Sequence, residues 1–95
     1  MNLTDEQLEQ LEEMAAALMP PADIAILLQI PHGKHDLFVQ ICKSHKSTVI
    51  YETYQRGKLT TKLKLRSTVI KLAIAGSPAA EPLAQKFISE QNIDK

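Results

Sequence analysis

Apolar residues recur at intervals of three and four along almost the whole chain, and no segment shows the sustained alternation of a β-strand. The first series of this kind consists of Leu8, Leu11, Ala15 and Leu18. Such spacing places the side chains on one face of a helix, where they can be buried together. The 95 residues are enough for one small domain. The sequence therefore predicts an all-α fold of about five helices in one compact unit.

The first predicted helix carries clear signals at both ends. Thr4 is a suitable N-cap, and Gln7 three residues later completes a capping box. Pro20 and Pro21 end the helix, because proline lacks an amide hydrogen and its ring clashes with the preceding turn. A short second helix is predicted over residues 21–29, since proline is tolerated in a first turn.

Residues 21–43 have the dimensions of a helix-turn-helix. The breaker cluster Ile30-Pro31-His32-Gly33 separates the short helix from a third helix predicted over residues 34–43. Ala25 is the small apolar residue that such a motif needs in its first helix, and Phe38 or Leu37 can anchor its second. The positions expected to be buried are Ile24, Ala25, Leu27, Leu28, Leu37, Phe38 and Ile41. A plain helical hairpin would give a similar pattern.

The longest predicted helix covers residues 48–75. Gly57 interrupts it, and because glycine costs about 1 kcal/mol relative to alanine inside a helix, it indicates a close contact or a bend. Gly76 is a good residue for stopping the helix. The last helix is predicted to begin after Ser77, with Pro78 in its first position, and to run to Gln91. Pro82 marks an alternative, later start.

The long helix has two apolar sides, and a helix that is apolar on two sides is covered on both. One side carries Leu59, Leu63, Ile70 and Ile74, and the other carries Leu65, Val69 and Leu72. The last helix, folded back as a hairpin, can cover one side. The N-terminal helices or a second subunit must cover the other, which favours an oligomer. We therefore divide the chain into an N-terminal helix and helix-turn-helix over residues 1–47, and a helical hairpin over residues 48–95.

Charge is sorted along the chain although the total is neutral. Residues 1–30 carry six acidic residues and no lysine or arginine, a net charge of −6. Residues 31–71 carry nine basic and two acidic residues, a net charge of +7. A clustered basic segment is typical of proteins that bind polyanions, because each cation that neutralises a phosphate releases a counterion. A solvated helix face is the alternative explanation.

The basic segment supplies the candidate DNA contacts. In a helix-turn-helix the second helix enters the major groove, where glutamine pairs with adenine and lysine reaches guanine or phosphate. The residues predicted to face bases or phosphates are Lys34, His35, Gln40 and Lys43. Those predicted to add contacts to the DNA backbone are Lys46, Arg56, Lys58 and Lys62. The predicted partner is therefore double-stranded DNA.

Other classes of function find little support in the sequence. The three glycines are far apart, so there is no glycine-rich phosphate loop, and no catalytic residue is predicted. The histidines His32, His35 and His45 lack zinc-ligand spacing, so neither a metal nor another cofactor is expected. The single cysteine, Cys42, cannot form an internal disulfide, and no apolar run approaches the roughly 20 residues of a membrane span. We expect a cytoplasmic protein.

The segment Ile50–Lys58, together with Ala75–Ala80, resembles the small subunits of bacteriophage terminases. In that family a helix-turn-helix precedes a Y-x-x-G-K/R segment, a long helix and a G-x-P/S-x-A turn into a final helix. Tyr54–Lys58 matches the first of these motifs and Ala75–Ala80 the second. The resemblance implies recognition of viral DNA for packaging, a homo-oligomer built through residues 48–91, regulation of a terminase large subunit, and the cytoplasm of a bacterial host.

Two other interpretations stay open. One is a small helix-turn-helix transcriptional regulator, acting as a dimer. The other is a protein-interaction module in which the acidic first helix of one subunit docks on the basic middle of another, with no need for DNA. The same pairing within one subunit would mask the DNA-binding surface. Removal of residues 1–19 separates these cases, since tighter DNA binding indicates masking and loss of the oligomer indicates docking.

Overall fold

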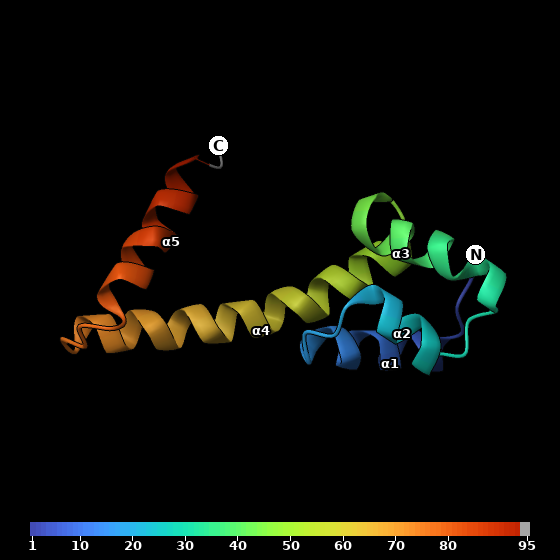
Figure 1. Cartoon of the computed structure of the whole chain (residues 1–95), viewed down its shortest axis with the longest axis horizontal. Helices are drawn as coiled ribbons and strands as arrows, with labels where there is room; N and C mark the ends of the chain where they lie inside the picture. Colours follow the sequence, from blue (N-terminus) through green and yellow to red (C-terminus); the bar gives the residue numbers. More distant parts are fainter. Residues whose placement is uncertain (94–95) are drawn as a thin grey trace. The chain divides into compact units, whose positions relative to one another are not determined.

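The computed structural model describes residues 1–93, which contain five α-helices and no strand (Figure 1). The α-helices are α1 (Asp5–Ala16), α2 (Pro21–Leu27), α3 (His35–Ser44), α4 (Val49–Ile74) and α5 (Glu81–Ile93), and a short 3₁₀-helix, η1 (His32–Lys34), precedes α3. The all-α prediction is confirmed. The chain divides into two compact units, residues 1–61 and 62–95, called unit 1 and unit 2 below. This division lies inside α4, whereas the sequence analysis drew it at residue 47.

Helix α1 begins as predicted but ends earlier. The Gln7 amide donates to the Thr4 hydroxyl at 3.1 Å and the Thr4 amide to the Gln7 side chain at 2.9 Å, so the capping box is confirmed. The helix stops at Ala16, before the prolines, because Leu18 takes a left-handed φ of 62°. The Met19 amide then donates to the Met14 carbonyl at 3.2 Å, which closes a Schellman motif. Leu18 is exposed, so the prediction that it extends the buried face is wrong.

Helix α2 ends in the same way, two residues before its predicted end. Gln29 has a φ of 58°, and the Ile30 amide donates to the Ala25 carbonyl at 3.1 Å. The reversal returns Ile30 to the core, where it is buried. Leu27 lies on the outer side of the helix and is 58% exposed, so its predicted burial is wrong. The turn after α2 thus has its left-handed residue at Gln29, and the predicted breaker residues His32 and Gly33 form η1 instead.

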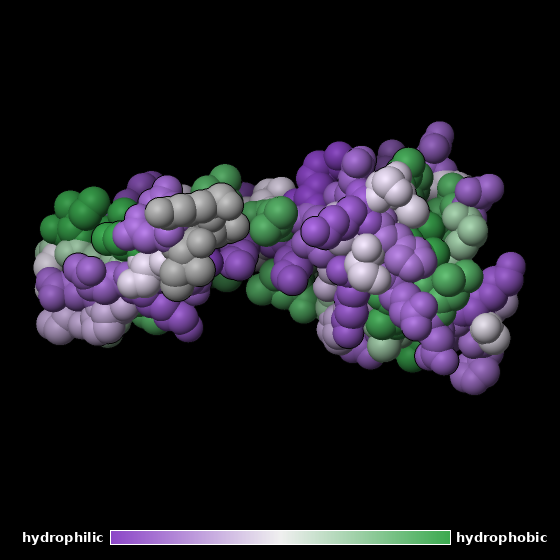
Figure 2. Space-filling view, turned by 90° about the horizontal axis from the view of Figure 1, so that it is seen from above, coloured by the Kyte–Doolittle hydropathy of each residue, from purple (hydrophilic) through white to green (hydrophobic). Residues whose placement is uncertain are grey.

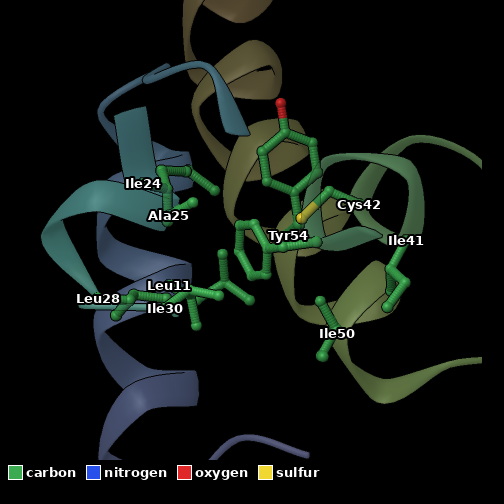
Figure 3. Packing of buried hydrophobic residues seen from close by; sticks show 11 residues of the cluster. Leu11, Ile24, Ala25, Leu28, Ile30, Ile41, Cys42, Ile50 and Tyr54 are labelled. Atoms are coloured by element: carbon green, nitrogen blue, oxygen red, sulfur yellow. The ribbon is translucent and has the colours of Figure 1, made fainter. Parts of the chain in front are cut away.

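One apolar core holds unit 1 together, and α1, α2, α3 and the start of α4 all contribute to it (Figure 3). Leu11, Ile24 and Tyr54 converge there from three different helices. The largest fully buried side chains are Phe38, Leu11, Ile24 and Cys42. Of the positions predicted to be buried in the helix-turn-helix, Ile24, Ala25, Leu28, Phe38 and Ile41 are confirmed. Leu37 is 41% exposed, so its predicted burial is wrong.

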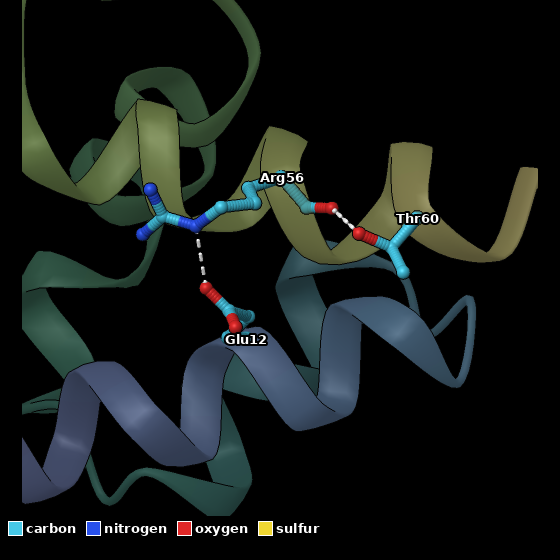
Figure 4. Close-up of polar contacts among 3 residues, drawn as sticks. All are labelled: Glu12, Arg56 and Thr60. Carbon is cyan, nitrogen blue, oxygen red and sulfur yellow. Dashed lines mark hydrogen bonds and ion pairs between the residues drawn. The ribbon is translucent and has the colours of Figure 1, made fainter. Parts of the chain in front are cut away.

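Gly57 marks a close contact between α1 and α4. A Cβ atom at this position would lie 2.4 Å from the carbonyl oxygen of Glu12, so only glycine lets the two backbones approach this closely. Beside it, Arg56 Nε donates to the Glu12 carboxylate at 2.7 Å (Figure 4). The Thr61 hydroxyl donates to the Ala16 carbonyl one turn further on. The first half of α4 therefore belongs to unit 1, and the close contact is the correct alternative for Gly57.

Unit 2 consists of the second half of α4, a turn and α5. Gly76 has a φ of 93°, and the Ser77 amide donates to the Leu72 carbonyl at 3.0 Å, so Gly76 ends α4 as predicted. Helix α5 begins at Glu81, which places Pro82 in its first turn. The later of the two predicted starts is therefore the one observed.

The chain turns back after Gly76, so that α5 meets α4 at Arg66. The Arg66 guanidinium pairs with the Glu90 carboxylate and also lies over the Phe87 ring, 4.3 Å from its centroid. A cation over an aromatic face is attracted by the negative face of the ring. The hydrogen bond from Arg66 lowers the pKa of Glu90, with the charge of Arg66 as a further cause. Arg66 is thus the residue that joins the two helices of unit 2.

Candidate nucleic-acid interface

Helix α3 presents a polar row on the side opposite its anchor. Phe38, Ile41 and Cys42 are buried and fix the inner side in the core. Gln40 and Lys43 are exposed and three residues apart, so they lie next to each other on the outer side. The structure therefore brings these two predicted contact residues together and leaves both free of the core. The side of α3 that carries Gln40 and Lys43 faces away from its buried residues Phe38, Ile41 and Cys42.

Asp36 belongs to the same outer row, and the sequence analysis did not include it. It is exposed and lies four residues before Gln40, one helical turn away. The spacing of Asp36, Gln40 and Lys43 was the signal that could have identified it. A carboxylate can accept a hydrogen bond from the amino group of cytosine, but it is repelled by phosphate. Asp36 thus favours an approach in which the part of the row formed by Asp36 and Gln40 meets base edges rather than the DNA backbone.

His35 has a structural role in the turn before α3. Its ring is partly buried, and Nε2 donates to the Ile30 carbonyl at 2.7 Å. The His32 ring lies beside it, with the ring centroids 5.2 Å apart. The bond ties the start of α3 to the end of the turn that follows α2. A DNA contact from His35 would have to use its other ring nitrogen, Nδ1. The Lys34 side chain, directly before His35, is exposed to solvent.

The remaining predicted cations lie on the connection after α3 and along α4. Lys46 is exposed between α3 and α4, and Lys58 is exposed on α4. Lys62 follows one helical turn after Lys58 on the same helix and is the first residue of unit 2. Arg56 is paired with Glu12, but the two side chains are 62% and 45% exposed. A surface pair of this kind contributes only about 0–1 kcal/mol, so Arg56 can exchange the carboxylate for a phosphate.

Most acidic residues of unit 1 lie on α1. Helix α1 carries Asp5, Glu6, Glu9, Glu12 and Glu13 and no basic residue. The basic residues of unit 1 all lie between residues 34 and 58. The segment that contains α3 and the first half of α4 therefore carries a net positive charge that attracts a polyanion, while Glu12 of α1 pairs with one of its cations, Arg56.

The single cysteine is buried and protonated. Burial raises the pKa of the Cys42 thiol to about 12, so it stays protonated at neutral pH. Within residues 1–93, no group of three or more His, Cys, Asp or Glu side chains is placed to hold a metal ion. No helix in the described part of the chain is both long and apolar enough to cross a membrane.

Comparisons with protein-family models, with curated proteins and with solved structures found no match to this chain.

Proposed function

We propose that this chain is a DNA-binding protein of a phage or prophage, and that it acts as a terminase small subunit. The observation that carries the DNA-binding part is the outer row of α3, where Gln40 and Lys43 stand exposed on a helix anchored by Phe38. A short helix, a compact turn and such a helix form the arrangement that helix-turn-helix proteins insert into the major groove. The packaging role is supported by the resemblance of Tyr54–Lys58 and Ala75–Ala80 to the family's motifs.

Different residues carry affinity and specificity in this proposal. Gln40 reads base edges, where a good bidentate pair discriminates by about 1–3 kcal/mol. The cations hold the phosphate backbone and bind every sequence alike. They are Lys34, Lys43, Lys46, Arg56, Lys58 and Lys62. Replacing Gln40 should therefore change which sequences bind, whereas replacing a lysine should weaken all of them.

Fluorescence anisotropy with labelled duplex DNA tests this division. Lys43→Ala should weaken binding to every duplex, and Gln40→Ala should lower the preference between duplexes with little effect on non-specific binding. Lys86→Ala is the matched control, because it removes one exposed lysine from α5. Circular dichroism confirms that each variant keeps its helical content. Equal affinities of Lys43→Ala and wild type would remove α3 from the DNA site.

Fragments tiled across the genome that encodes the chain separate packaging from transcription control. A terminase small subunit should prefer one or a few fragments near the packaging site and should associate with the large subunit. A transcriptional regulator should instead prefer the fragment upstream of its own gene. If the protein showed no preference among the fragments and did not bind the large subunit, the packaging role would be refuted while DNA binding could stand.

Self-association is part of the proposal, and unit 2 supplies its physical reason. Ala80 is the only buried hydrophobic residue in the described part of unit 2. A segment shorter than about 40 residues rarely folds stably without a disulfide, a metal or another chain. Within the described residues of unit 2, the contact of Arg66 with Glu90 and Phe87 is only partly buried. Unit 2 is thus expected to gain stability from a second copy.

A further inference from the structure

The two apolar sides of α4 remain open in unit 2 after α5 has folded back. Leu63 is 66% exposed and Ile74 is 82% exposed, and they lie eleven residues apart, about three turns along one side. The exposed large aliphatic residues of the described part of unit 2 are Leu63, Leu65, Ile70, Leu72, Ile74, Leu83 and Ile88. Figure 2 shows hydrophobic residues reaching the surface in this part of the chain. So many exposed aliphatic side chains mark a surface that another molecule covers.

Unit 1 contains an apolar groove of about 620 Å³ beside α3. Leu37 and Ile41 of α3 form one wall, and Val49 at the start of α4 forms another. The N-terminal residues 1–3, Leu8 of α1, Ile50 and the polar residues His45 and Thr48 complete the lining. Leu37 and Val49 are 41% and 62% exposed, so the groove is open to solvent at both walls. The helical spacing of Leu37 predicted that it is buried in the core, but Leu37 lines this groove instead.

The two units that carry these surfaces have net charges of opposite sign. Unit 1 has eight acidic and five basic residues, a net charge of −3, and unit 2 has three acidic and six basic residues, a net charge of +3. Next to residues that line the groove, Glu52 is exposed one turn after Val49, and Lys46 is exposed directly after His45. Lys62 and Lys71 are exposed and flank the open side of α4 that carries Leu63 and Ile74. The opposite net charges of the two units favour a contact between unit 1 of one copy and unit 2 of another.

We propose that the groove of unit 1 binds unit 2 of a second copy of the chain. The surface of unit 2 that enters the groove is the side of α4 that carries Leu63 and Ile74. An amphipathic helix with apolar residues at helical spacing is the usual occupant of such a groove. The contact is heterologous, because it joins two different surfaces. Heterologous contacts repeat from copy to copy and close into a ring or continue as a filament. The proposal specifies the self-association in the proposed function and does not rest on DNA binding.

Three variants of the full chain test the contact by analytical ultracentrifugation. Val49→Asp places a charge in the groove, and an acidic residue at the start of a helix is favourable for the helix itself. The double variant Leu63→Lys/Ile74→Lys places charges on the open side of unit 2. Each should weaken self-association at least tenfold. The control Ile26→Lys/Leu27→Lys changes two equally exposed residues of α2 outside the groove and should assemble like wild type.

Mixing the two defective variants gives the decisive result. Val49→Asp keeps a functional unit 2, and Leu63→Lys/Ile74→Lys keeps a functional groove, so together they should form a 1:1 complex that does not grow further. If Val49→Asp assembles like wild type while the double variant does not, the contact joins two copies of unit 2 and the proposal is wrong. A monomeric wild-type chain, or no complex in the mixture, also overturns it.

Two measurements keep the test independent of folding and of DNA binding. Should Val49→Asp lose helical content in circular dichroism, Leu37→Asn replaces it on the opposite wall of the groove. Lys43→Ala, which weakens DNA binding, should assemble like wild type. A failure of assembly and a failure of DNA binding are therefore observed in separate experiments.

Discussion

Replacing Gly57 with alanine should destabilise unit 1, although alanine is the better helix former. The added Cβ would lie 2.4 Å from the carbonyl oxygen of Glu12, 2.9 Å from the Cβ of Ala15 and 3.1 Å from the amide nitrogen of Ala16. Carbon and carbonyl oxygen usually approach no closer than about 3.3 Å, so α1 would have to move by about 1 Å. Two of the three neighbours are backbone atoms, and no rotamer change relieves the clash.

One stabilising and two destabilising effects set the size of the change. Alanine gains about 1 kcal/mol over glycine inside a helix. Overpacking of a tight contact costs about 1–3 kcal/mol. A shift of α1 also weakens the hydrogen bond from the Thr61 hydroxyl to the Ala16 carbonyl, worth about 1 kcal/mol. We expect the free energy of unfolding to fall by about 2 kcal/mol, with the overpacking cost as the largest contribution.

Urea unfolding followed by circular dichroism and tyrosine fluorescence measures this change, since Tyr54 lies in the core. Gly33→Ala is the matched control, because a Cβ at Gly33 meets nothing within 4 Å. Its effect should stay within about 0.5 kcal/mol. If Gly57→Ala were as stable as wild type or more stable, α1 and α4 could not be in the contact described here.

Three further residues give predictions that need no partner. Gln29→Gly should raise the free energy of unfolding in urea by about 1 kcal/mol, because an L residue is strained at a φ of 58°, whereas Gln29→Ala should give no gain. The Cys42 thiol, with its pKa raised to about 12, should react with iodoacetamide at least about 100-fold more slowly than in the unfolded chain. Equal alkylation rates in the folded and the unfolded chain would contradict this protection. The free energy of unfolding should also fall as the pH rises above 9.0, the ordinary pKa of the thiol, because the thiol ionises first in the unfolded chain. Arg66 holds the pKa of Glu90 below its ordinary value of 4.5, so their pair stabilises unit 2 above that pH and is lost as the pH falls through the lowered pKa. Glu90→Gln should remove this part of the pH dependence of the circular dichroism signal, and an unchanged profile would assign it to another group.

Local sequence chemistry predicted the parts of the fold that depend on neighbouring residues. The capping box of Thr4 and Gln7 needs only a helix start, and Gly76 needs only a left-handed residue after α4. Both are encoded within a few positions, so both could be read directly. Gly57 was recognised as unusual, but its partner could not be named because Glu12 lies 45 positions earlier in the chain.

The errors have one physical origin, which is that spacing identifies apolar residues but not their surroundings. Leu18 and Gln29 end their helices in the left-handed conformation. Glycine or asparagine is the residue usually expected at this position. Leu27 and Leu37 have helical spacing with buried neighbours, but each points away from the core. Only the packing of α1, α2 and α3 decides which of several adjacent apolar residues faces inwards.

The candidate site was predictable in part for the same reason. The exposed cations and Gln40 follow from helical spacing, since polar residues opposite an apolar anchor must face solvent. The tertiary partners were not predictable. His35 bonds to the Ile30 carbonyl across the turn, and Arg56 pairs with a carboxylate 44 positions away. The groove beside α3 also needed the structure, because it is formed by residues from both ends of unit 1.

The affinity of wild-type protein for duplex DNA, measured at a series of salt concentrations, tests the central proposal most directly. Six cations are proposed to contact phosphates, so the logarithm of the affinity should fall against the logarithm of the salt concentration with a slope of about −5. Lys43→Ala should reduce the slope by about 1. A slope near zero, or one that Lys43→Ala leaves unchanged, would contradict the assignment of α3 and its neighbouring cations to a DNA-binding surface.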